Sequence, residues 1–369
     1  MAIHTMNDLK QLQAMPLQVK ILMSKTRIRA WIDEYGEDGV YISFSGGKDS
    51  TVLLDLVRED YPNVRAVFVD TGLEYPEIRE FVKTFDNVDI VRPKMNFKQV
   101  IEKYGYPFMS KEVSKTVQRA RKELSKVGSD NLFEAYELKK QRGEKIYCYS
   151  KIIFGELEHK EKGKLTGEYS KQYDRSRYKF FLNAPFEISA ACCDVMKKAP
   201  IKKYAKETNR VAITGQMAEE SHLRTQKWLK YGCNAFECKD PISNPLSFWT
   251  EQDILKYIKE KNLKICSVYG DIVVDYSSED QLNGQLDFSD IGLMSDNRKL
   301  KTTGCKRTGC MFCGYGCHME KPGEGRFEKM KETHPKLYDY IMRPKDQGGL
   351  NYKEVIDWIN ENGNLNIRY

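Results

Sequence analysis

The stretch Ser43-Phe44-Ser45-Gly46-Gly47-Lys48-Asp49-Ser50 lies between an apolar run, Val40 to Phe44, and an amphipathic run that begins Thr51-Val52-Leu53-Leu54. A short apolar run that stops at glycines predicts a buried strand, and the amphipathic run after them predicts a helix. The sequence therefore predicts a strand, a glycine loop and a helix in direct succession, which is the repeating unit of an α/β sheet.

The residue types in this loop favour a bound phosphate chain. Backbone N–H groups of such a loop and the N-terminus of the following helix both attract anions. Gly46 and Gly47 let the backbone approach a phosphate closely, Lys48 supplies a point charge, and Asp49 can help hold Mg²⁺. The spacing is not that of a Walker A loop. The predicted nucleotide-binding residues here are Ser43, Ser45, Gly46, Gly47, Lys48, Asp49 and Ser50.

The loop resembles the PP-loop of the ATP pyrophosphatase families, which split ATP into AMP and pyrophosphate. The resemblance implies an adenine nucleotide alpha hydrolase-like fold, ATP and Mg²⁺ as cofactors, and a catalytic part for Lys48 and Asp49. It also implies a common reaction, in which an oxygen is adenylylated so that another nucleophile can displace it.

The first hundred residues predict alternating strands and helices around this loop. The expected elements are a strand at 64–69, a helix at 75–85, a strand at 88–91 and a helix at 96–104. They indicate a doubly wound parallel sheet, in which ligands bind beyond the carboxyl ends of the strands. We therefore expect Asp70, Thr71 and Gly72 to face the same crevice as the glycine loop, with Asp70 acting on metal or ribose.

Composition limits the class of protein. The chain has 369 residues, of which 40% are hydrophobic and 31% charged, enough for two to three globular domains. No apolar run approaches the length of a membrane span, and Met1 to Lys10 is too polar for a signal peptide. We expect a cytoplasmic protein with no membrane partner.

The net charge of +7 is concentrated in one region, since residues 111–180 contain 18 Lys or Arg and 11 Asp or Glu. This region belongs to a basic insertion at about 105–185, which is either a nucleic-acid surface or a solvated charged lobe. The tyrosines available to stack on bases are Tyr147, Tyr149, Tyr169, Tyr173 and Tyr178. The expected domains are an N-terminal helical segment at 1–37, a nucleotide-binding domain at 38–260 and a Cys-rich helical module at 261–369.

A second resemblance rests on residues downstream of the insertion. Ala191-Cys192-Cys193-Asp194 precedes a predicted helix through Lys206 and a strand at 211–213, and a turn from Gly215 to Arg224 contains Glu220-Ser221. Together with Asn244-Pro245-Leu246 these motifs resemble the APS/PAPS (phosphoadenosine phosphosulfate) reductase family, over roughly residues 38–100 and 188–260. The resemblance implies that Gly215 and Arg224 also bind the nucleotide.

Three features depart from those reductases. Their PP-loop is degraded, whereas the loop here is intact. Their Gly-x-Arg-Arg appears here as Gly215-Gln216-Met217-Ala218, and their C-terminal Glu-Cys-Gly-x-His is absent from the end of this chain. The intact loop favours ATP cleavage, as in PP-loop proteins of DNA phosphorothioation and tRNA thiolation.

Ten cysteines indicate metal ligation rather than disulfides in a cytoplasmic protein. Four of them fall within Gly304 to His318, namely Cys305, Cys310, Cys313 and Cys317. These four can form a self-contained site; alternatively, Cys192 and Cys193 join Cys310 and Cys313, as the reductase resemblance implies. We prefer the second set, with Cys305 or Cys317 as a substitute ligand or as the thiol that works on sulfur. A [4Fe–4S] cluster is favoured, with structural Zn²⁺ as the alternative.

The leading hypothesis is a PP-loop ATP pyrophosphatase that adenylylates a substrate and, with an iron–sulfur cluster, supports sulfur transfer. A sulfur or electron donor protein and a nucleic acid are the expected partners besides the nucleotide. One alternative is a divergent APS/PAPS reductase, which needs Cys233, Cys305 or Cys317 as the thiol that attacks sulfur. Another is a nucleotide-gated binding module with structural zinc.

Overall fold

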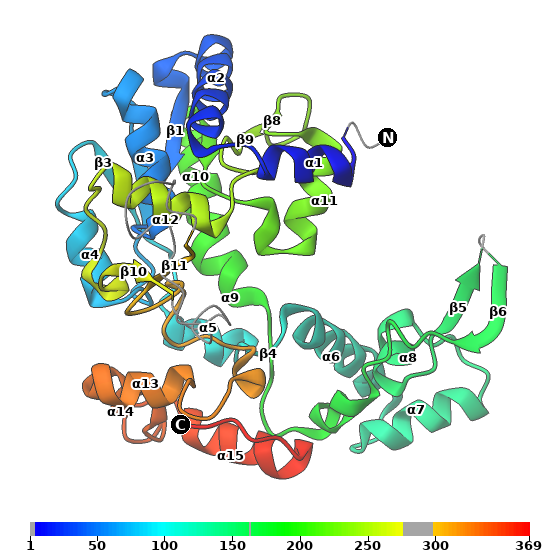
Figure 1. Cartoon of the computed structure of the whole chain (residues 1–369). Helices are drawn as coiled ribbons and strands as arrows, with labels where there is room; N and C mark the ends of the chain where they lie inside the picture. Colours follow the sequence, from blue (N-terminus) through cyan, green and yellow to red (C-terminus); the bar gives the residue numbers. More distant parts are fainter. Residues whose placement is uncertain (1–3, 162–163, 276–297) are drawn as a thin grey trace, which may run out of the picture. The chain divides into compact units, whose positions relative to one another are not determined.

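The computed structural model describes residues 4–161, 164–275 and 298–369 (Figure 1). These residues divide into two compact units. The first unit takes in Met1–Asp70, Glu74–Arg92 and Pro200–Gly309, and the second takes in Thr71–Leu73, Pro93–Ala199 and Cys310–Tyr369. Each unit is therefore assembled from segments far apart in the sequence, and the boundaries expected at residues 38 and 261 stay predictions.

A six-stranded sheet forms the centre of the first unit, with the strand order β3-β2-β1-β7-β9-β8. Its strands are β1 (Val40–Ser43), β2 (Ala66–Val69), β3 (Val88–Val91), β7 (Val211–Thr214), β8 (Asn234–Ala235) and β9 (Ile242–Ser243). All neighbours pair in parallel except β8 with β9. In register, Ile42 lies opposite both Ala66 and Ile213. The predicted doubly wound α/β fold is confirmed.

Alternating residues of β1 supply two cores. Val40, Ile42 and Phe44 join the main core, whereas Tyr41 packs with Val67 and Tyr204 in a smaller core on the opposite face. Successive strand side chains point to opposite faces, so a strand buried on both faces is apolar throughout. The helices that supply the two cores are α1 (Met6–Gln13), α2 (Leu17–Tyr35), α3 (Lys48–Asp60), α4 (Pro76–Val82), α10 (Ala199–Thr208), α11 (His222–Tyr231) and α12 (Glu251–Glu260).

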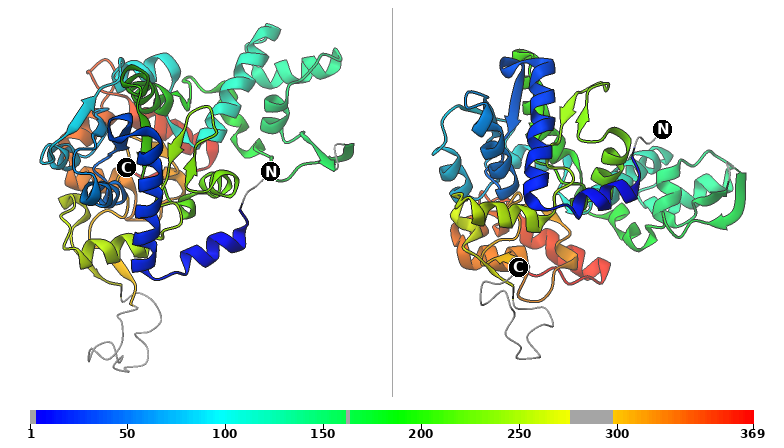
Figure 2. Two further views of the ribbon diagram at one scale, coloured as in Figure 1. Left: turned by 90° about the horizontal axis from the view of Figure 1, so that it is seen from above. Right: turned by 45° about the horizontal axis from the view of Figure 1, so that its top comes forward.

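The periphery of the first unit contains two further pieces. Helix α1 (Met6–Gln13) starts at a capping box in which Thr5 and Asp8 exchange hydrogen bonds, and α2 follows it as the long blue helix of Figure 2. Strands β10 (Ile272–Val274) and β11 (Leu300–Thr302) form an antiparallel pair.

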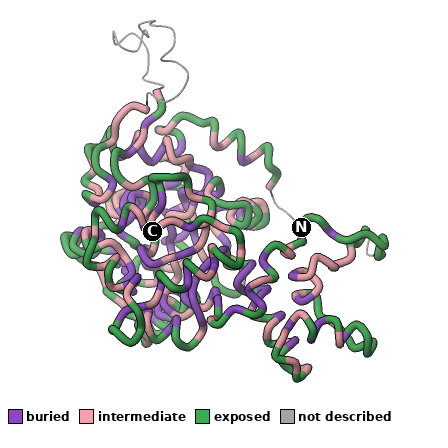
Figure 3. The backbone as a smooth tube through the Cα atoms, turned by 90° about the horizontal axis from the view of Figure 1, so that it is seen from below, coloured by how far each residue is buried: buried purple, intermediate pink, exposed green. Residues whose placement is uncertain are grey.

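The second unit is mainly helical. Its helices are α5 (Phe97–Tyr104), α6 (Lys111–Leu124), α7 (Leu132–Gln141), α8 (Cys148–Phe154), α9 (Ala191–Cys193), α13 (Arg326–Thr333), α14 (Pro335–Met342) and α15 (Tyr352–Gly363). Strand β4 (Phe108–Met109) pairs in parallel with β12 (Gly314–Tyr315), and β5 (Glu158–Glu161) pairs with β6 (Lys164–Tyr169). Figure 3 shows that the β5–β6 hairpin is largely exposed.

The expected helix through Lys206 is interrupted. Helix α9 passes into a π-helical turn at Asp194–Lys198 before α10 begins at Ala199. Pro200 lacks a backbone N–H and cannot donate to the carbonyl of Met196, which favours a new helix start at this point. Single π-turns are frequent at functional sites, and this one follows directly after the Cys192–Cys193 doublet.

Among the described residues, no helix combines the length and the apolar character that a bilayer span requires.

Candidate functional site

The glycine loop leaves β1 at Ser43 and enters α3 at Lys48. Gly46 has φ of +70°, and a Cβ there would lie 2.8 Å from Val82 Cγ2 and 2.9 Å from Ile78 Cγ2. The loop therefore requires glycine at this position both for its left-handed backbone and for its packing on α4.

Hydroxyl groups stabilise the loop from within. Ser50 Oγ accepts a hydrogen bond from Ser45 N at 3.2 Å and donates to Gly47 O at 2.9 Å. Thr51 Oγ1 also donates to Gly47 O, at 3.0 Å. The predicted binding residues Ser45, Gly47 and Ser50 are thus brought together in one hydrogen-bonded turn at the carboxyl end of β1.

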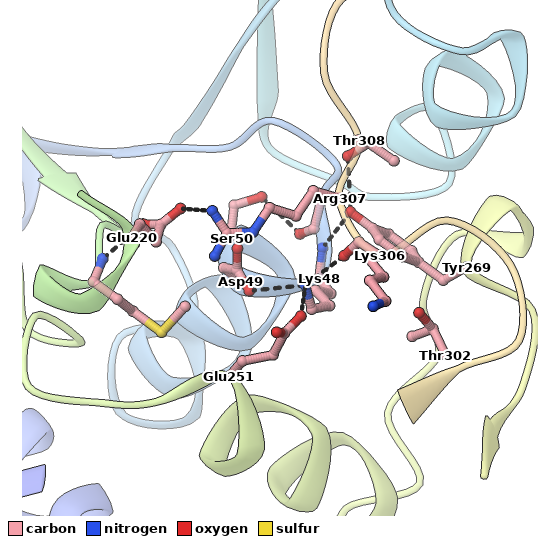
Figure 4. A network of polar contacts seen from close by, with 12 residues as sticks. Lys48, Asp49, Ser50, Glu220, Glu251, Tyr269, Thr302, Lys306, Arg307 and Thr308 are labelled. Carbon is pink, nitrogen blue, oxygen red and sulfur yellow. Dashed lines mark hydrogen bonds and ion pairs between the residues drawn. The ribbon is translucent and has the colours of Figure 1, made fainter. Parts of the chain in front are cut away.

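Lys48 is buried, with 2% of its side chain exposed, and its ammonium group faces the centre of the site (Figure 4). Its Nζ donates to Lys306 O at 2.8 Å and lies 3.2 Å from Glu251 Oε1. Such a buried cation, with Glu251 at 3.2 Å and Asp49 at 3.8 Å, is suited to bind a polyanion.

A segment from the far end of the first unit contacts the same loop. The backbone N–H of Lys48 donates to Tyr269 OH at 3.1 Å, and this hydroxyl lies 2.8 Å from Thr308 Oγ1. Since Lys306 O also contacts Lys48, residues 306–308 form a strap across the start of α3 (Figure 4). Sequence reasoning missed Tyr269 and the strap, because no local pattern links them to a loop more than two hundred positions earlier.

Asp49 carries an unsatisfied carboxylate oxygen. Its Oδ1 is buried and, among the described residues, has no hydrogen-bond partner; the nearest cation is Lys48 Nζ at 3.8 Å. Burial raises the pKa of the Asp49 carboxyl, while the charges of Lys48 and Arg307 oppose that rise. An orphaned carboxylate oxygen beside a phosphate-binding loop fits a hard cation, so the residues present suit Mg²⁺ with ATP.

The end of β7 approaches the same helix start. A Cβ on Gly215 would lie 3.0 Å from Asp49 O, so the chain after β7 passes close to the first turn of α3. Arg224, on α11, pairs with Glu220, and Arg307 Nη1 lies 3.7 Å from Glu220 Oε1. Burial and the charge of Arg307 lower the pKa of Arg224. Gly215 therefore lies beside the first turn of α3, and the charge of Asp49 acts on Arg224; that these two residues bind the nucleotide stays a prediction, and Arg307 is an additional cation.

Carboxylates surround these cations. Glu251 N, at the start of α12, donates to Glu219 Oε1 at 2.6 Å, and burial raises the pKa of Glu219. The site thus combines the buried Lys48 and two more exposed arginines with acidic groups, which is the mixture that a phosphate chain with a bound metal ion requires.

Asp70 lies at the end of β2 with 7% of its side chain exposed. Arg79 Nε is 3.1 Å from Asp70 Oδ1, and Arg92 Nε is 3.1 Å from Asp70 Oδ2. Two guanidinium groups thus hold this carboxylate, and its catalytic role stays a prediction. Thr71 and Gly72 group with the second unit, where Thr71 Oγ1 accepts from Leu73 N at 3.2 Å.

A cavity of about 310 Å³ opens beside the end of β7. Gln216, Arg224, Trp228 and Cys238 contribute to its lining. Cys238 Sγ donates to Asp240 O at 3.0 Å, whereas Cys233 is buried and accepts from Ser247 Oγ. The cavity shares Arg224 with the group of charged residues near the glycine loop.

Four of the predicted ligand cysteines interact in the second unit. The thiol of Cys192 is under the electrostatic influence of Cys193, Cys310 and Cys313. Cys193 and Cys192 share a hydrogen bond that, with the charge of Lys111, lowers the pKa of Cys193 to about 5 and raises that of Cys192. Cys317 is buried, donates to Gly314 O at 2.9 Å, and has its pKa raised to about 12 by burial.

The geometry does not form a closed metal site. Within residues 4–161, 164–275 and 298–369, no three Cys, His, Asp or Glu side chains are arranged so that they could hold a metal ion. The chemistry of the donor set nevertheless suits soft-metal ligation, because thiolates are the ligands of Fe–S clusters and structural zinc. Cys305 groups with the first unit instead, and its Sγ lies 3.7 Å from Tyr75 OH.

Several known proteins are similar to parts of the chain. A phosphoadenosine 5'-phosphosulfate reductase of Xylella fastidiosa is 31% identical over 90 residues, 24% of this chain and 36% of that protein. An adenosine 5'-phosphosulfate reductase of Geobacillus kaustophilus is 35% identical over 77 residues, 21% and 30% of the two chains. The matched stretches thus span about a third of these relatives.

A solved structure, the phosphoadenylyl-sulfate (PAPS) reductase of Candida auris in a phosphate complex, aligns with 74% of this chain and 97% of its own at a TM-score of 0.35 and 15% identity. The family described as phosphoadenosine phosphosulfate reductase domain matches residues 39–134 and 129–314, well over half of the chain. The resemblance seen in the sequence motifs is confirmed, and the chain belongs to the phosphoadenosine phosphosulfate reductase domain family.

Proposed function

We propose that the protein is a PP-loop ATP pyrophosphatase that adenylylates a substrate oxygen and supports its replacement by sulfur. The observation that carries this proposal is the intact Ser45–Ser50 loop with its buried Lys48 and the unpartnered Oδ1 of Asp49. Reduction of a sulfonucleotide does not require an ATP-cleaving loop or a Mg²⁺ ligand within it.

The chemistry follows from the positions of these groups. The substrate oxygen attacks the α-phosphorus of ATP, the bond from that phosphorus to the β-phosphate oxygen breaks, and pyrophosphate leaves. Loop N–H groups and the Lys48 ammonium stabilise the negative charge that develops on pyrophosphate. Asp49 would hold Mg²⁺, which would neutralise further charge on the phosphates. The product is an adenylyl ester, from which AMP is a good leaving group.

Sulfur transfer needs a thiol near the nucleotide. Cys305 is the candidate in the first unit, since it precedes the strap residues that contact Lys48, whereas Cys233 is buried in the main core. A persulfide loaded on Cys305 by a sulfur donor protein attacks the adenylylated carbon with its terminal sulfur, and AMP departs with the oxygen. A second thiol then reduces the remaining S–S bond and becomes part of a disulfide.

Cys192, Cys193, Cys310 and Cys313 are the residues that would hold an iron–sulfur cluster. A [4Fe–4S] cluster, when bound, supplies one-electron chemistry or a site for sulfur, and Zn²⁺ in its place supplies only structural support. Iron and acid-labile sulfide analysis after anaerobic purification separates these two possibilities.

The first test follows the fate of α-labelled ATP. We expect AMP and pyrophosphate to form with Mg²⁺, and Lys48→Met to reduce AMP formation about 100-fold, in line with the loss of one charge-stabilising group. Lys306→Met removes a lysine side chain from the strap and is the matched control. We expect this variant to keep activity, because Lys306 contacts Lys48 through its backbone carbonyl and not through its side chain. Binding of ATP without any turnover contradicts the proposal and favours a nucleotide-gated binding module.

The second candidate function is APS or PAPS reduction, which the two curated reductase relatives favour. In that reaction a Cys305 thiolate attacks the sulfur of the sulfonucleotide and the nucleotide leaves, forming an S-sulfonated cysteine. A protein thiol then releases sulfite as a disulfide forms. Sulfite release from APS or PAPS without ATP, abolished by Cys305→Ser but not by Cys266→Ser, distinguishes this function from the first.

A further inference from the structure

Helix α6 has a charged face and an apolar face. Its buried side includes Val113, Val117, Ala120 and Leu124, a spacing of four, three and four residues. Lys115, Arg119, Lys122 and Lys126 repeat with the same spacing and are all exposed. Residues three and four apart share a helix face, so Lys115, Arg119 and Lys122 form a stripe along α6, and Lys126 continues it in the 3₁₀ turn Ser125–Val127 that follows the helix.

The stripe borders a cavity of about 570 Å³. We call this cavity the tyrosine groove; its lining includes Arg119, Lys122, Lys126, Arg142, Tyr147 and Tyr149. All of these residues belong to the second unit and come from α6 and the 3₁₀ turn after it, from the start of α8, or from the end of α7.

The carboxylates of the tyrosine groove are already engaged. Lys139 Nζ lies 3.7 Å from Glu123 Oε1 and 3.6 Å from Glu144 Oε2. Glu123 also accepts hydrogen bonds from Tyr147 N at 3.1 Å and Ser150 Oγ at 2.6 Å. These two acids therefore hold the lobe together and leave the mouth of the groove positively charged.

The cations at the mouth of the tyrosine groove differ from these carboxylates in their ion pairing. In the part of the chain that the structure describes, neither Lys122 nor Lys126 has a carboxylate within ion-pair distance. Like charges held close together on one helix face destabilise the free protein slightly, and an anionic ligand relieves that repulsion.

Two tyrosine rings stand among these charges. Tyr147 is 55% exposed, with Lys145 Nζ 5.1 Å from its ring centroid. The guanidinium of Arg119 lies 4.4 Å from the ring centroid of Tyr149. A large exposed aromatic ring beside cations is the arrangement on which unpaired bases stack while their phosphates are neutralised.

We propose that the tyrosine groove binds single-stranded nucleic acid, with Lys122 and Lys126 on phosphates and Tyr147 stacked on a base. That this nucleic acid is the sulfur acceptor rests on the proposed function, whereas its binding to the groove does not. A duplex keeps its bases stacked inside and offers none to Tyr147, so single strands are preferred.

The test measures fluorescence anisotropy of labelled 20-nucleotide oligo-dT and oligo-rU, a duplex of equal length, and inorganic polyphosphate, with the full chain and no ATP. We expect a single strand to bind at least fivefold more tightly than the duplex or polyphosphate. Lys122→Ala/Lys126→Ala weakens binding at least tenfold and reduces its salt dependence. The stronger of the two single strands identifies the acceptor as DNA or RNA.

Matched variants separate the groove from general charge. Lys171→Ala/Lys179→Ala removes the same charge from exposed positions outside the groove, and we expect less than a twofold effect. Tyr147→Ala weakens single-strand binding at least fivefold, Tyr147→Phe retains it, and Tyr173→Ala, also exposed, leaves it unchanged. Equal losses in the groove and control variants, or equal affinity for polyphosphate, overturn the proposal.

A separate readout keeps the two proposals distinguishable. The Lys122→Ala/Lys126→Ala protein should cleave ATP at the rate of the unaltered protein when no nucleic acid is present. Failure of single-strand binding with intact ATP cleavage refutes the groove alone, whereas binding without cleavage refutes the proposed function alone.

Discussion

At the scale of single residues, Asp49 combines a functional position with a cost to stability. Burial raises the pKa of its carboxyl, so the protonated form is favoured in the folded protein and the ionised form is penalised. The destabilisation therefore appears as pH rises through the folded-state pKa and is absent in acid.

Replacing Asp49 by Asn should accordingly raise the melting temperature while abolishing AMP formation. At neutral pH we expect the melting temperature to rise by a few degrees, which corresponds to about 1 kcal/mol in the free energy of unfolding. Near pH 4 the rise should be smaller. Thermal scans of both proteins across pH measure the difference. An unchanged or lower melting temperature at neutral pH contradicts the inferred penalty.

Gly46 and Gly72 permit a matched comparison of backbone strain and crowding. Both have positive φ, but a Cβ on Gly46 meets Val82 and Ile78, whereas a Cβ on Gly72 meets no atom of the described residues within 4 Å. Gly46→Ala should lower the free energy of unfolding by about 2 to 4 kcal/mol, and Gly72→Ala by about 1 kcal/mol. Urea denaturation measures both, and equal losses would show that crowding at Gly46 is relieved without energetic cost.

At the scale of elements, a buried ion pair joins α2 to α12. Lys20, 1% exposed, donates to Asp253 Oδ2 at 2.6 Å and to Gln13 O at 2.7 Å. Asp253 also completes the capping box of α12 by accepting from Thr250 N at 2.7 Å. One carboxylate thereby fixes both the start of a helix and its packing against another.

Removing the cation alone should be the most harmful change to this pair. We expect Lys20→Met to destabilise the protein by about 3 kcal/mol, because it leaves Asp253 buried without its counter-charge. Lys20→Met/Asp253→Asn should recover at least half of that loss, since Asn neutralises the site and can still accept the capping bond. Chemical denaturation of the three proteins gives the comparison, and a double variant less stable than Lys20→Met would refute the explanation.

Local patterns predicted the elements around the glycine loop closely. The strand expected at 88–91 is β3, and the helix expected at 96–104 is α5 within one residue. The site was only partly predictable, because Tyr269, Arg307 and Thr308 reach Lys48 or Glu220 through tertiary contacts that leave no periodic signal in the sequence. The π-turn after Cys193 could not be predicted either. Pro200 is compatible with a kink in one helix and with the start of a new helix, and the sequence does not decide between the two.

At the scale of the whole molecule, the proposed cluster ligands come from two distant segments, 192–193 and 310–313. If they ligate a [4Fe–4S] cluster, Cys193→Ala or Cys310→Ala should reduce bound iron from about four atoms per chain to less than one, with loss of the broad absorbance near 400 nm. Cys148→Ala is the control, since Cys148 is exposed and lies outside both segments. Iron retained in both ligand variants, with loss in Cys305→Ala, would favour the self-contained set.

The strap at residues 306–308 already uses the groups that a nucleotide needs. Lys306 O accepts a hydrogen bond from the Lys48 ammonium, and Tyr269 OH accepts one from the Lys48 backbone N–H. A phosphate that binds either of these donors must therefore first displace a protein oxygen. If the chain binds ATP as proposed, its apparent affinity should equal the affinity of the open site multiplied by the fraction of molecules in which the strap is lifted. Cys305 directly precedes Lys306, so lifting the strap would also move that thiol, and under the proposed function the binding of ATP would set the time at which sulfur transfer begins.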